Sequence, residues 1–119
     1  MWTKILGTKK PNVFIAEMDG ELAGFIGYGA PRDKEMPFDC ELRAINILEK
    51  FHRKGIGRAL VSRAINKLRN AGHKHVYLWV AQDNINAVSF YEHLGFLKTE
   101  HQKTERDIKE ICYSLVLEK

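Results

Sequence analysis

The run VYLWVA at residues 76–81 constrains the fold more than any other part of the sequence, because it is apolar on both faces. Such a run is typical of a strand that lies buried inside a parallel sheet. A helix is predicted before it, from Ile56 to Ala71, because apolar residues recur there every four positions and Gly72 follows as a C-terminal stop. A strand, a helix and a parallel strand need a crossover connection, which is right-handed in nearly all proteins. The sequence therefore predicts an α/β fold.

The remaining sequence predicts further strands and a second helix. The step from Asp19 to Gly20 is a strong hairpin signal. Strands are predicted at residues 13–17, 22–28, 41–48, 96–100 and 111–117, and a short helix is predicted from Asn84 through Leu94. The polar stretch HQKTERD is interpreted as the connection between the last two strands. Residues 1–119 are thus expected to form a single domain in which helices flank a mixed central sheet.

Composition excludes several classes of protein. No apolar run approaches the roughly 20 residues that a membrane-spanning helix needs, and the N-terminal MWTKILGTKK lacks the apolar core of a signal peptide. We therefore expect a cytoplasmic protein with no membrane partner. Cys40 and Cys112 are isolated, with no histidine at metal-ligand spacing, so free thiols and no metal site are expected.

Charge is distributed unevenly along the chain. Between Lys50 and Gln82 the sequence has eight Lys or Arg residues and no Asp or Glu. A basic block of this kind suits either nucleic acid or the phosphates of a small ligand. Aromatic residues are not interleaved on the basic face, so a nucleic-acid partner is not expected.

The stretch HRKGIGRAL at residues 52–60 joins the predicted strand 41–48 to the predicted helix 56–71. The first backbone N–H groups of a helix have no intrahelical partner, and the helix dipole is positive at that end. Glycine lets a backbone approach an anion closely, and the flanking Arg and Lys side chains add positive charge. The stretch therefore predicts a phosphate or pyrophosphate site. The alternative is a glycine turn that precedes a basic, solvated helix.

Two motifs together resemble those of the GNAT superfamily of N-acetyltransferases. They are FHRKGIGRAL and, one strand downstream, NINAVSFYEHLGF at residues 84–96. The resemblance is strong over residues 41–96 and looser over the flanking strands. It implies direct transfer of the acetyl group of acetyl-CoA to a primary amine on a small-molecule or peptide acceptor. The alternative is a non-catalytic acyl-CoA sensor, which would bind the cofactor and release no CoA.

The resemblance also implies where acetyl-CoA binds. Gly55 and Gly57 match the two motif glycines, and His52 takes the place of the family's Arg or Gln. Asn84 matches a residue that contacts the pantetheine arm, although it is also a candidate N-cap of the second helix. Phe90 is a candidate for the core as well as for cofactor contact. The implied set is Ile45, Ile47, His52, Arg53, Lys54, Gly55, Ile56, Gly57, Arg58, Asn84, Phe90 and Tyr91.

Three residues are implied for the chemistry. Tyr91 matches the family tyrosine near the thioester sulfur, where a hydroxyl can protonate the leaving thiolate. The main-chain N–H of Ile47 is implied as the donor to the oxyanion. Glu41 stands where several relatives carry a catalytic glutamate that takes the amine proton through water, and its alternative is an ordinary solvated carboxylate.

The acceptor is the least constrained part of the prediction. The acidic stretch with Asp33, Glu35, Asp39 and Glu41 is expected to line the acceptor side and to favour a cationic amine, unless it is an ordinary solvated loop. Relatives usually carry a strand and two helices before the first hairpin, whereas 12 residues precede Val13 here. Either the chain is a minimal or truncated member of the family, or a second subunit completes the pocket. For the second case a homodimer is expected, in which the partner closes the pocket.

Overall fold

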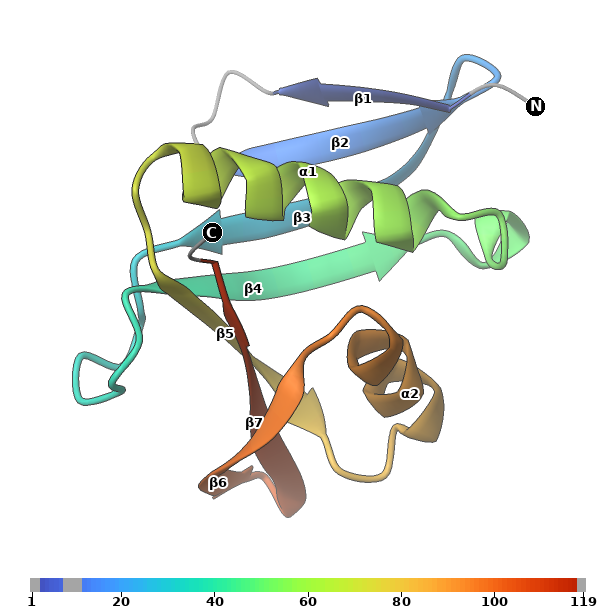
Figure 1. Ribbon diagram of the computed structural model, residues 1–119. Helices are drawn as coiled ribbons and strands as arrows, with labels where there is room; N and C mark the ends of the chain where they lie inside the picture. The colour runs from blue at the N-terminus through green and yellow to red at the C-terminus, as the bar shows by residue number, and fades with distance from the viewer. Residues whose placement is uncertain (1–2, 8–11, 118–119) are drawn as a thin grey trace.

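The computed structural model of the protein describes residues 3–7 and 12–117 (Figure 1). Residues 1–2, 8–11 and 118–119 of the predicted single domain lie outside the described residues. The described elements are β1 (Thr3–Gly7), β2 (Val13–Met18), β3 (Glu21–Gly29), β4 (Cys40–Ile47), the 3-10 turn η1 (Glu49–Phe51), α1 (Ile56–Asn70), β5 (His75–Ala81), α2 (Ile85–His93), β6 (Leu97–Glu105) and β7 (Ile108–Val116). The strands form one seven-stranded sheet in the order β1-β2-β3-β4-β5-β7-β6.

The sheet is mixed, and its one parallel pair opens into a gap. β4 and β5 run parallel and pair only at Cys40 with Val76 and at Glu41 with Tyr77, whereas the other neighbouring strands are antiparallel. Beyond that pairing the two strands diverge, as Figure 1 shows. The C-terminal half of β4 therefore keeps one edge free of strand pairing, and this edge faces the opening toward α2.

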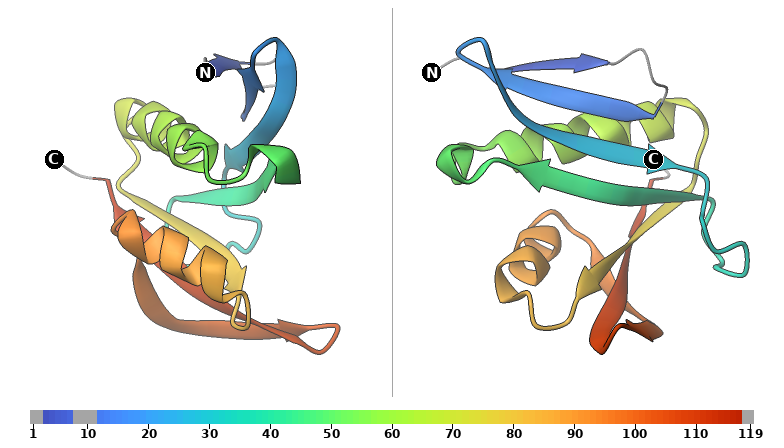
Figure 2. Two further views of the ribbon diagram at one scale, coloured as in Figure 1. Left: turned by 90° about the vertical axis from the view of Figure 1, so that its right-hand side faces the viewer. Right: turned by 180° about the vertical axis from the view of Figure 1, so that it is seen from behind.

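Helix α1 forms because its apolar residues lie on one face. Ile56, Leu60, Val61, Ala64 and Leu68 are buried, whereas Arg58, Arg63 and Lys67 are exposed on the other face. Each buried aliphatic side chain stabilises the fold by about 1.5–3 kcal/mol. The helix lies across β1 to β4, and α2 packs beside β5 (Figures 1 and 2). The predicted α/β fold with helices flanking a mixed sheet is confirmed.

Two parts of the fold differ from the sequence prediction. β1 was not expected, and it pairs antiparallel with β2 from Thr3 with Met18 to Gly7 with Phe14. HQKTERD is not a loop: most of it belongs to β6, and the turn to β7 is made by Arg106 and Asp107 at φ 49 and 65. Polar residues suit β6 because it is an edge strand with much of its surface in water, so the strand needs no apolar pattern.

The described helices are all too short or too polar to cross a lipid bilayer.

Local capping interactions fix where the two helices end or begin. Gly72, in the left-handed region at φ 92, follows α1 and lets His73 N–H donate to the Leu68 carbonyl at 3.1 Å. The Asn84 side chain accepts from Ala87 N–H at 3.2 Å, which confirms Asn84 as the N-cap of α2.

Candidate active site

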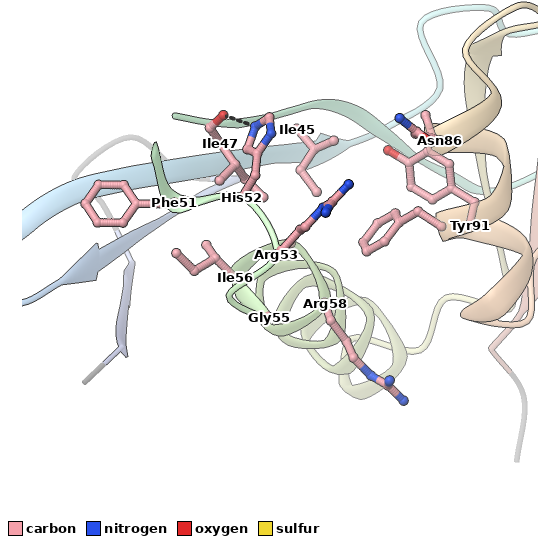
Figure 3. A pocket seen from close by; sticks show the side chains of 13 residues that line it. Ile45, Ile47, Phe51, His52, Arg53, Gly55, Ile56, Arg58, Asn86 and Tyr91 are labelled. Carbon is pink, nitrogen blue, oxygen red and sulfur yellow. Dashed lines mark hydrogen bonds between the residues drawn. The ribbon is translucent and has the colours of Figure 1, made fainter. Parts of the chain in front are cut away.

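A cavity of about 670 Å³ lies between the end of β4, the start of α1 and one face of α2 (Figure 3). All of the sequence-predicted cofactor residues line it except Lys54 and Asn84. Phe51, Asn86 and Ala87 also line it and were missed. Helical spacing could have revealed two of them, because Asn86 and Ala87 precede Phe90 and Tyr91 by four residues and so share their face of α2.

The loop from Arg53 to Arg58 has the backbone of an anion site. Arg53 and Gly55 adopt left-handed conformations with φ 63 and 79, and Gly55 is the N-cap of α1 with no side-chain capping bond. The first turn of α1 carries no acidic side chain. Its first N–H groups therefore remain available, and the positive helix dipole and the Arg53 and Arg58 side chains add to them. This arrangement suits a phosphate or pyrophosphate.

Gly57 of α1 lies close to side chains of β4 and α2. A Cβ placed on it would lie 3.0 Å from Ile47 Cδ1 and 3.2 Å from Phe90 Cζ. A side chain at this position would therefore crowd Ile47 and Phe90. Gly55 differs, because a Cβ there meets nothing within 4 Å and its positive φ alone favours glycine.

The main chain of Ile47 faces the opening between β4 and β5. Leu48 N–H donates to the Ala23 carbonyl of β3 at 2.8 Å. Successive N–H groups along a strand point to opposite edges. The N–H group of Ile47 therefore points away from β3. Its carbonyl accepts a 2.9 Å hydrogen bond from His52 Nε2, which ties the loop to the strand (Figure 3).

Tyr91 is 9% exposed and projects from α2 into the same opening (Figure 3). Its ring packs against Phe90 and Phe96, with centroids 5.2 and 5.8 Å away. Burial raises the pKa of Tyr91 to about 12, so the phenol keeps its proton at neutral pH. A neutral hydroxyl can donate a hydrogen bond or a proton.

A second cavity, of about 410 Å³, adjoins the first beside β3, β4 and β5. Ile45, Ala87 and Tyr91 line both cavities and form the boundary between them. Asn84, which does not line the first cavity, lines the second. A ligand in one cavity and a ligand in the other would therefore meet at Tyr91.

The predicted acidic stretch is divided among different surroundings. Asp33 and Glu35 line a third cavity, of about 500 Å³, together with Trp79. Asp39 accepts hydrogen bonds from the N–H groups of Lys74 and His75 at 2.9 Å each, and so caps the start of β5. These four acids were expected to line the acceptor side, but Asp39 and Glu41 are instead hydrogen-bonded within the protein.

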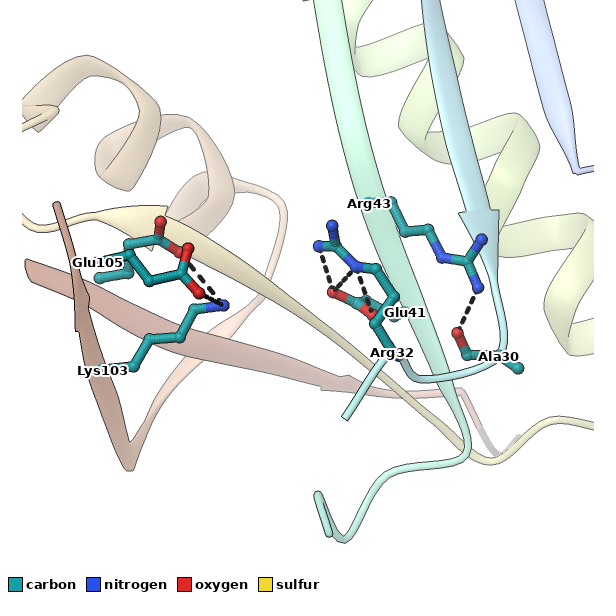
Figure 4. A network of polar contacts seen from close by, with 7 residues as sticks. Ala30, Arg32, Glu41, Arg43, Lys103 and Glu105 are labelled. Carbon is teal, nitrogen blue, oxygen red and sulfur yellow. Dashed lines mark hydrogen bonds and ion pairs between the residues drawn. The ribbon is translucent and has the colours of Figure 1, made fainter. Parts of the chain in front are cut away.

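Glu41 is not a solvated carboxylate, since it is only 1% exposed. Arg32 covers it: the Arg32 N–H and Nη2 donate to its two oxygens at 2.9 and 2.8 Å (Figure 4). Burial alone would raise the pKa of Glu41, but the hydrogen bonds and charge of Arg32 outweigh burial and lower it. Glu41 is therefore ionised at neutral pH, and it lines neither of the two cavities beside Tyr91.

Acid should destabilise the protein through Asp39 and Glu41. Burial alone would raise the pKa of Asp39. Hydrogen bonds from backbone N–H groups stabilise its charged form and lower the pKa overall. A pKa lower in the folded state contributes stability above the unfolded-state value, near pH 4, that is lost as pH falls through the folded-state value. Urea unfolding from pH 6 to pH 2 should show this loss, and Asp39→Asn, Glu41→Gln should flatten it. An equally steep loss in that variant would assign the effect to other groups.

Asp39, Cys40 and His73 offer ligand atoms within 4.8 Å of one another, a grouping that the sequence spacing did not reveal. Contacts within the protein explain why these three side chains lie together. The buried Cys40 thiol donates to the His75 carbonyl at 3.3 Å, and desolvation, followed by the nearby Asp39 charge, raises its pKa to about 12. Because the Cys40 thiol and the Asp39 carboxylate already have hydrogen-bond partners in the protein, we assign no ion here.

Comparison with known proteins identifies the family. Residues 2–96 match the model of the Acetyltransferase (GNAT) family. The uncharacterized N-acetyltransferase YuaI of Bacillus subtilis strain 168 is 35% identical over 81 residues, which are 67% of this chain and 46% of that protein. An N-alpha-acetyltransferase of Sulfurisphaera tokodaii is 36% identical over 93 residues, 70% of this chain and 54% of that protein. The chain belongs to the GNAT acetyltransferase family, and it spans about half the length of these relatives.

Solved structures share the fold. Ard1 from Thermoplasma volcanium has a TM-score of 0.79 at 21% identity, covering 91% of this chain and 72% of that one. The structure of yncA from Salmonella typhimurium, determined with its cofactor acetyl-CoA, has a TM-score of 0.74 at 23% identity, covering 89% and 64%. At these identities the similarity is evidence for the fold alone.

Proposed function

We propose that this chain transfers the acetyl group of acetyl-CoA to a primary amine. One observation carries the proposal: a buried, neutral Tyr91 stands at the boundary of two cavities, one of which begins at a loop whose backbone suits an anion. Membership of the GNAT family and a fold shared with a protein solved with acetyl-CoA support it. The two cavities offer separate places for donor and acceptor.

Each residue has a role that follows from its position. Acetyl-CoA supplies an activated acyl group as a thioester. The N–H groups of the loop and the Arg53 and Arg58 side chains hold the phosphates at the start of α1. The Ile47 N–H donates to the acyl oxygen as negative charge develops on it. The Tyr91 hydroxyl donates its proton toward the sulfur as the carbon–sulfur bond breaks.

The acceptor amine must also lose a proton, and Glu41 is the proposed base. Its carboxylate is ionised, is paired with Arg32 and lies outside both cavities, so the proposal requires that water carry the proton to it. We expect Glu41→Gln to lower turnover with little change in acetyl-CoA affinity. Turnover from pH 6 to pH 10 and the melting temperature should be measured together. A variant with a lowered melting temperature and full turnover in the folded fraction would assign Glu41 to stability alone.

A panel of primary amines tests the proposed function. Wild-type protein, acetyl-CoA and each amine are mixed, and the free thiol of CoA is followed over time. Release that depends on the amine, with the acetylated amine detected by mass spectrometry, is expected. A protein that binds acetyl-CoA and releases no CoA with any amine would be the acyl-CoA sensor instead.

Two earlier expectations stay predictions. A homodimer, in which the partner subunit closes the open cavities, should appear in sedimentation analysis as twice the 13.7 kDa mass of the chain. A monomer with full turnover would show that the partner is not needed.

A cytoplasmic location is tested by fractionation of cells that express the protein.

A further inference from the structure

The turn from Leu48 to His52 joins the end of β4 to the loop of residues 53–58. The Phe51 N–H donates to the Leu48 carbonyl at 2.8 Å, and the His52 N–H donates to the Glu49 carbonyl at 3.0 Å. Phe51 is buried in the core and anchors this turn. His52 itself is extended, and the left-handed part of the loop follows it directly. His52 is therefore the residue at which the turn passes into the loop.

The His52 side chain reaches back across the turn to β4. Its Nε2 lies 2.9 Å from the Ile47 carbonyl oxygen (Figure 3). A carbonyl can only accept, so Nε2 carries the hydrogen. β4 pairs with β5 only at Cys40 and Glu41, so within the described part of the chain no strand holds Ile47 at this edge. The ring of His52 takes the place of a strand partner there.

Ile47 also supplies the proposed donor to the acyl oxygen. The N–H and the carbonyl of one strand residue point to the same edge of the strand. The carbonyl that His52 holds and the N–H that would contact the acyl oxygen therefore share the free edge of β4. Loss of the His52 bond would let the end of β4 twist and would turn this N–H with it.

We propose that His52 is a positioning residue that fixes the Ile47 N–H relative to the loop of residues 53–58. The inference rests on the proposed acetyl transfer and adds a residue to it. Phosphates held at the start of α1 would then place the thioester where the Ile47 N–H reaches its oxygen. Binding energy from a remote part of a substrate can in this way lower the barrier at the reacting centre. The alternative is a direct contact between the His52 ring and the phosphates, which would act on affinity instead.

Two acetyl donors measure this coupling. Acetyl-CoA carries the phosphates, whereas S-acetyl-N-acetylcysteamine presents the same thioester without them. Each is titrated against a reactive amine, and kcat is taken from the saturation curve. In wild-type protein, kcat with acetyl-CoA should exceed kcat with the short donor by about tenfold or more, because the bound phosphates orient the thioester.

Two variants at residue 52 test the role of the ring. His52→Ala should lower kcat with acetyl-CoA by about tenfold, the effect of one ordinary hydrogen bond, with little change in acetyl-CoA affinity. The same variant should leave kcat with the short donor nearly unchanged, because that donor is free to follow Ile47. His52→Gln keeps an N–H donor of similar reach and should restore most of the kcat.

His93→Ala is the matched control. His93 lies on α2 outside both cavities beside Tyr91, and its Nδ1 lies 2.7 Å from the Ser89 carbonyl. This variant also removes a ring that is hydrogen-bonded to a main-chain carbonyl, and it should leave kcat with both donors at the wild-type value. Circular dichroism verifies that each variant is folded.

Hydrogen exchange followed by NMR gives a readout that needs no turnover. Acetyl-CoA without an amine should slow exchange at the N–H groups of residues 53–58 and at the Ile47 N–H of wild-type protein. In His52→Ala the slowing should persist at residues 53–58 and be lost at Ile47.

The outcomes separate this inference from the proposed function. If His52→Ala weakens acetyl-CoA binding and keeps kcat, if both donors lose kcat equally, or if His52→Gln is as slow as His52→Ala, the positioning role is wrong and acetyl transfer survives. If the exchange pattern is as expected and no amine is acetylated, His52 has the proposed role at Ile47 and the transfer is wrong. If no amine reacts and Ile47 exchanges alike in wild type and His52→Ala, both are wrong.

Discussion

Gly57→Val is expected to abolish acetyl-CoA binding while the protein stays folded. A Cβ at residue 57 would already lie 3.0 Å from Ile47 Cδ1 and 3.2 Å from Phe90 Cζ, and valine adds two methyl groups there. Ile47 and Phe90 both line the main cavity, so a displacement of their side chains changes its shape. Helix propensity does not oppose the change, because valine is better than glycine inside a helix. Calorimetric titration with acetyl-CoA measures the loss, and circular dichroism verifies the fold.

Two glycines in left-handed conformations serve as matched controls. Gly55→Ala and Gly72→Ala each place a Cβ at positive φ, at opposite ends of α1, and each should cost about 1–2 kcal/mol of stability. Gly55→Ala should also weaken acetyl-CoA binding, because it alters the anion-binding loop, whereas Gly72→Ala should not. Wild-type affinity in Gly57→Val would place the cofactor outside this cavity.

Tyr91→Phe is expected to lower turnover by about a hundredfold with little change in acetyl-CoA affinity. The aromatic ring still packs against Phe90 and Phe96, while the hydroxyl that donates to the leaving sulfur is lost. Because burial raises the pKa of Tyr91 to about 12, the wild-type rate should show no loss from tyrosine ionisation up to about pH 10. Steady-state kinetics with a reactive amine, from pH 6 to pH 10, measure both effects.

Tyr113→Phe is the matched control for the loss of a hydroxyl. Tyr113 is buried in β7, and its hydroxyl donates to Glu92 at 3.1 Å without lining either cavity beside Tyr91. This variant should keep wild-type turnover. Equal turnover in Tyr91→Phe and the wild type would remove the acid role.

Local patterns predicted the fold best where one segment carries its own signal. Periodic apolar residues and Gly72 predicted α1, and the doubly apolar run 76–81 predicted β5, which pairs on both sides. β1 and the full length of β6 were missed because both lie at sheet edges, where pairing with one neighbour stabilises a strand that needs no apolar pattern. Such strands depend on contacts that are distant in sequence.

In the candidate site, too, only the parts with a signal local in sequence could be predicted. The loop around Gly55 could be recognised because its N–H groups and charges are consecutive in sequence. The crowding around Gly57 could not be predicted, because the atoms that a side chain there would meet belong to Ile47 and Phe90 on other elements. From the sequence, Glu41 could be a catalytic base or a solvated strand-end carboxylate, and only the fold shows that Arg32 encloses it.

A crystal structure of the protein with acetyl-CoA tests the central claim most directly. We predict that the pyrophosphate lies on the N–H groups of residues 53–58 at the start of α1. The thioester sulfur should lie within about 3.5 Å of the Tyr91 hydroxyl, and the acetyl oxygen should lie at a similar distance from the Ile47 N–H. Acetyl-CoA bound elsewhere, or bound here with its thioester directed away from Tyr91, would contradict the account.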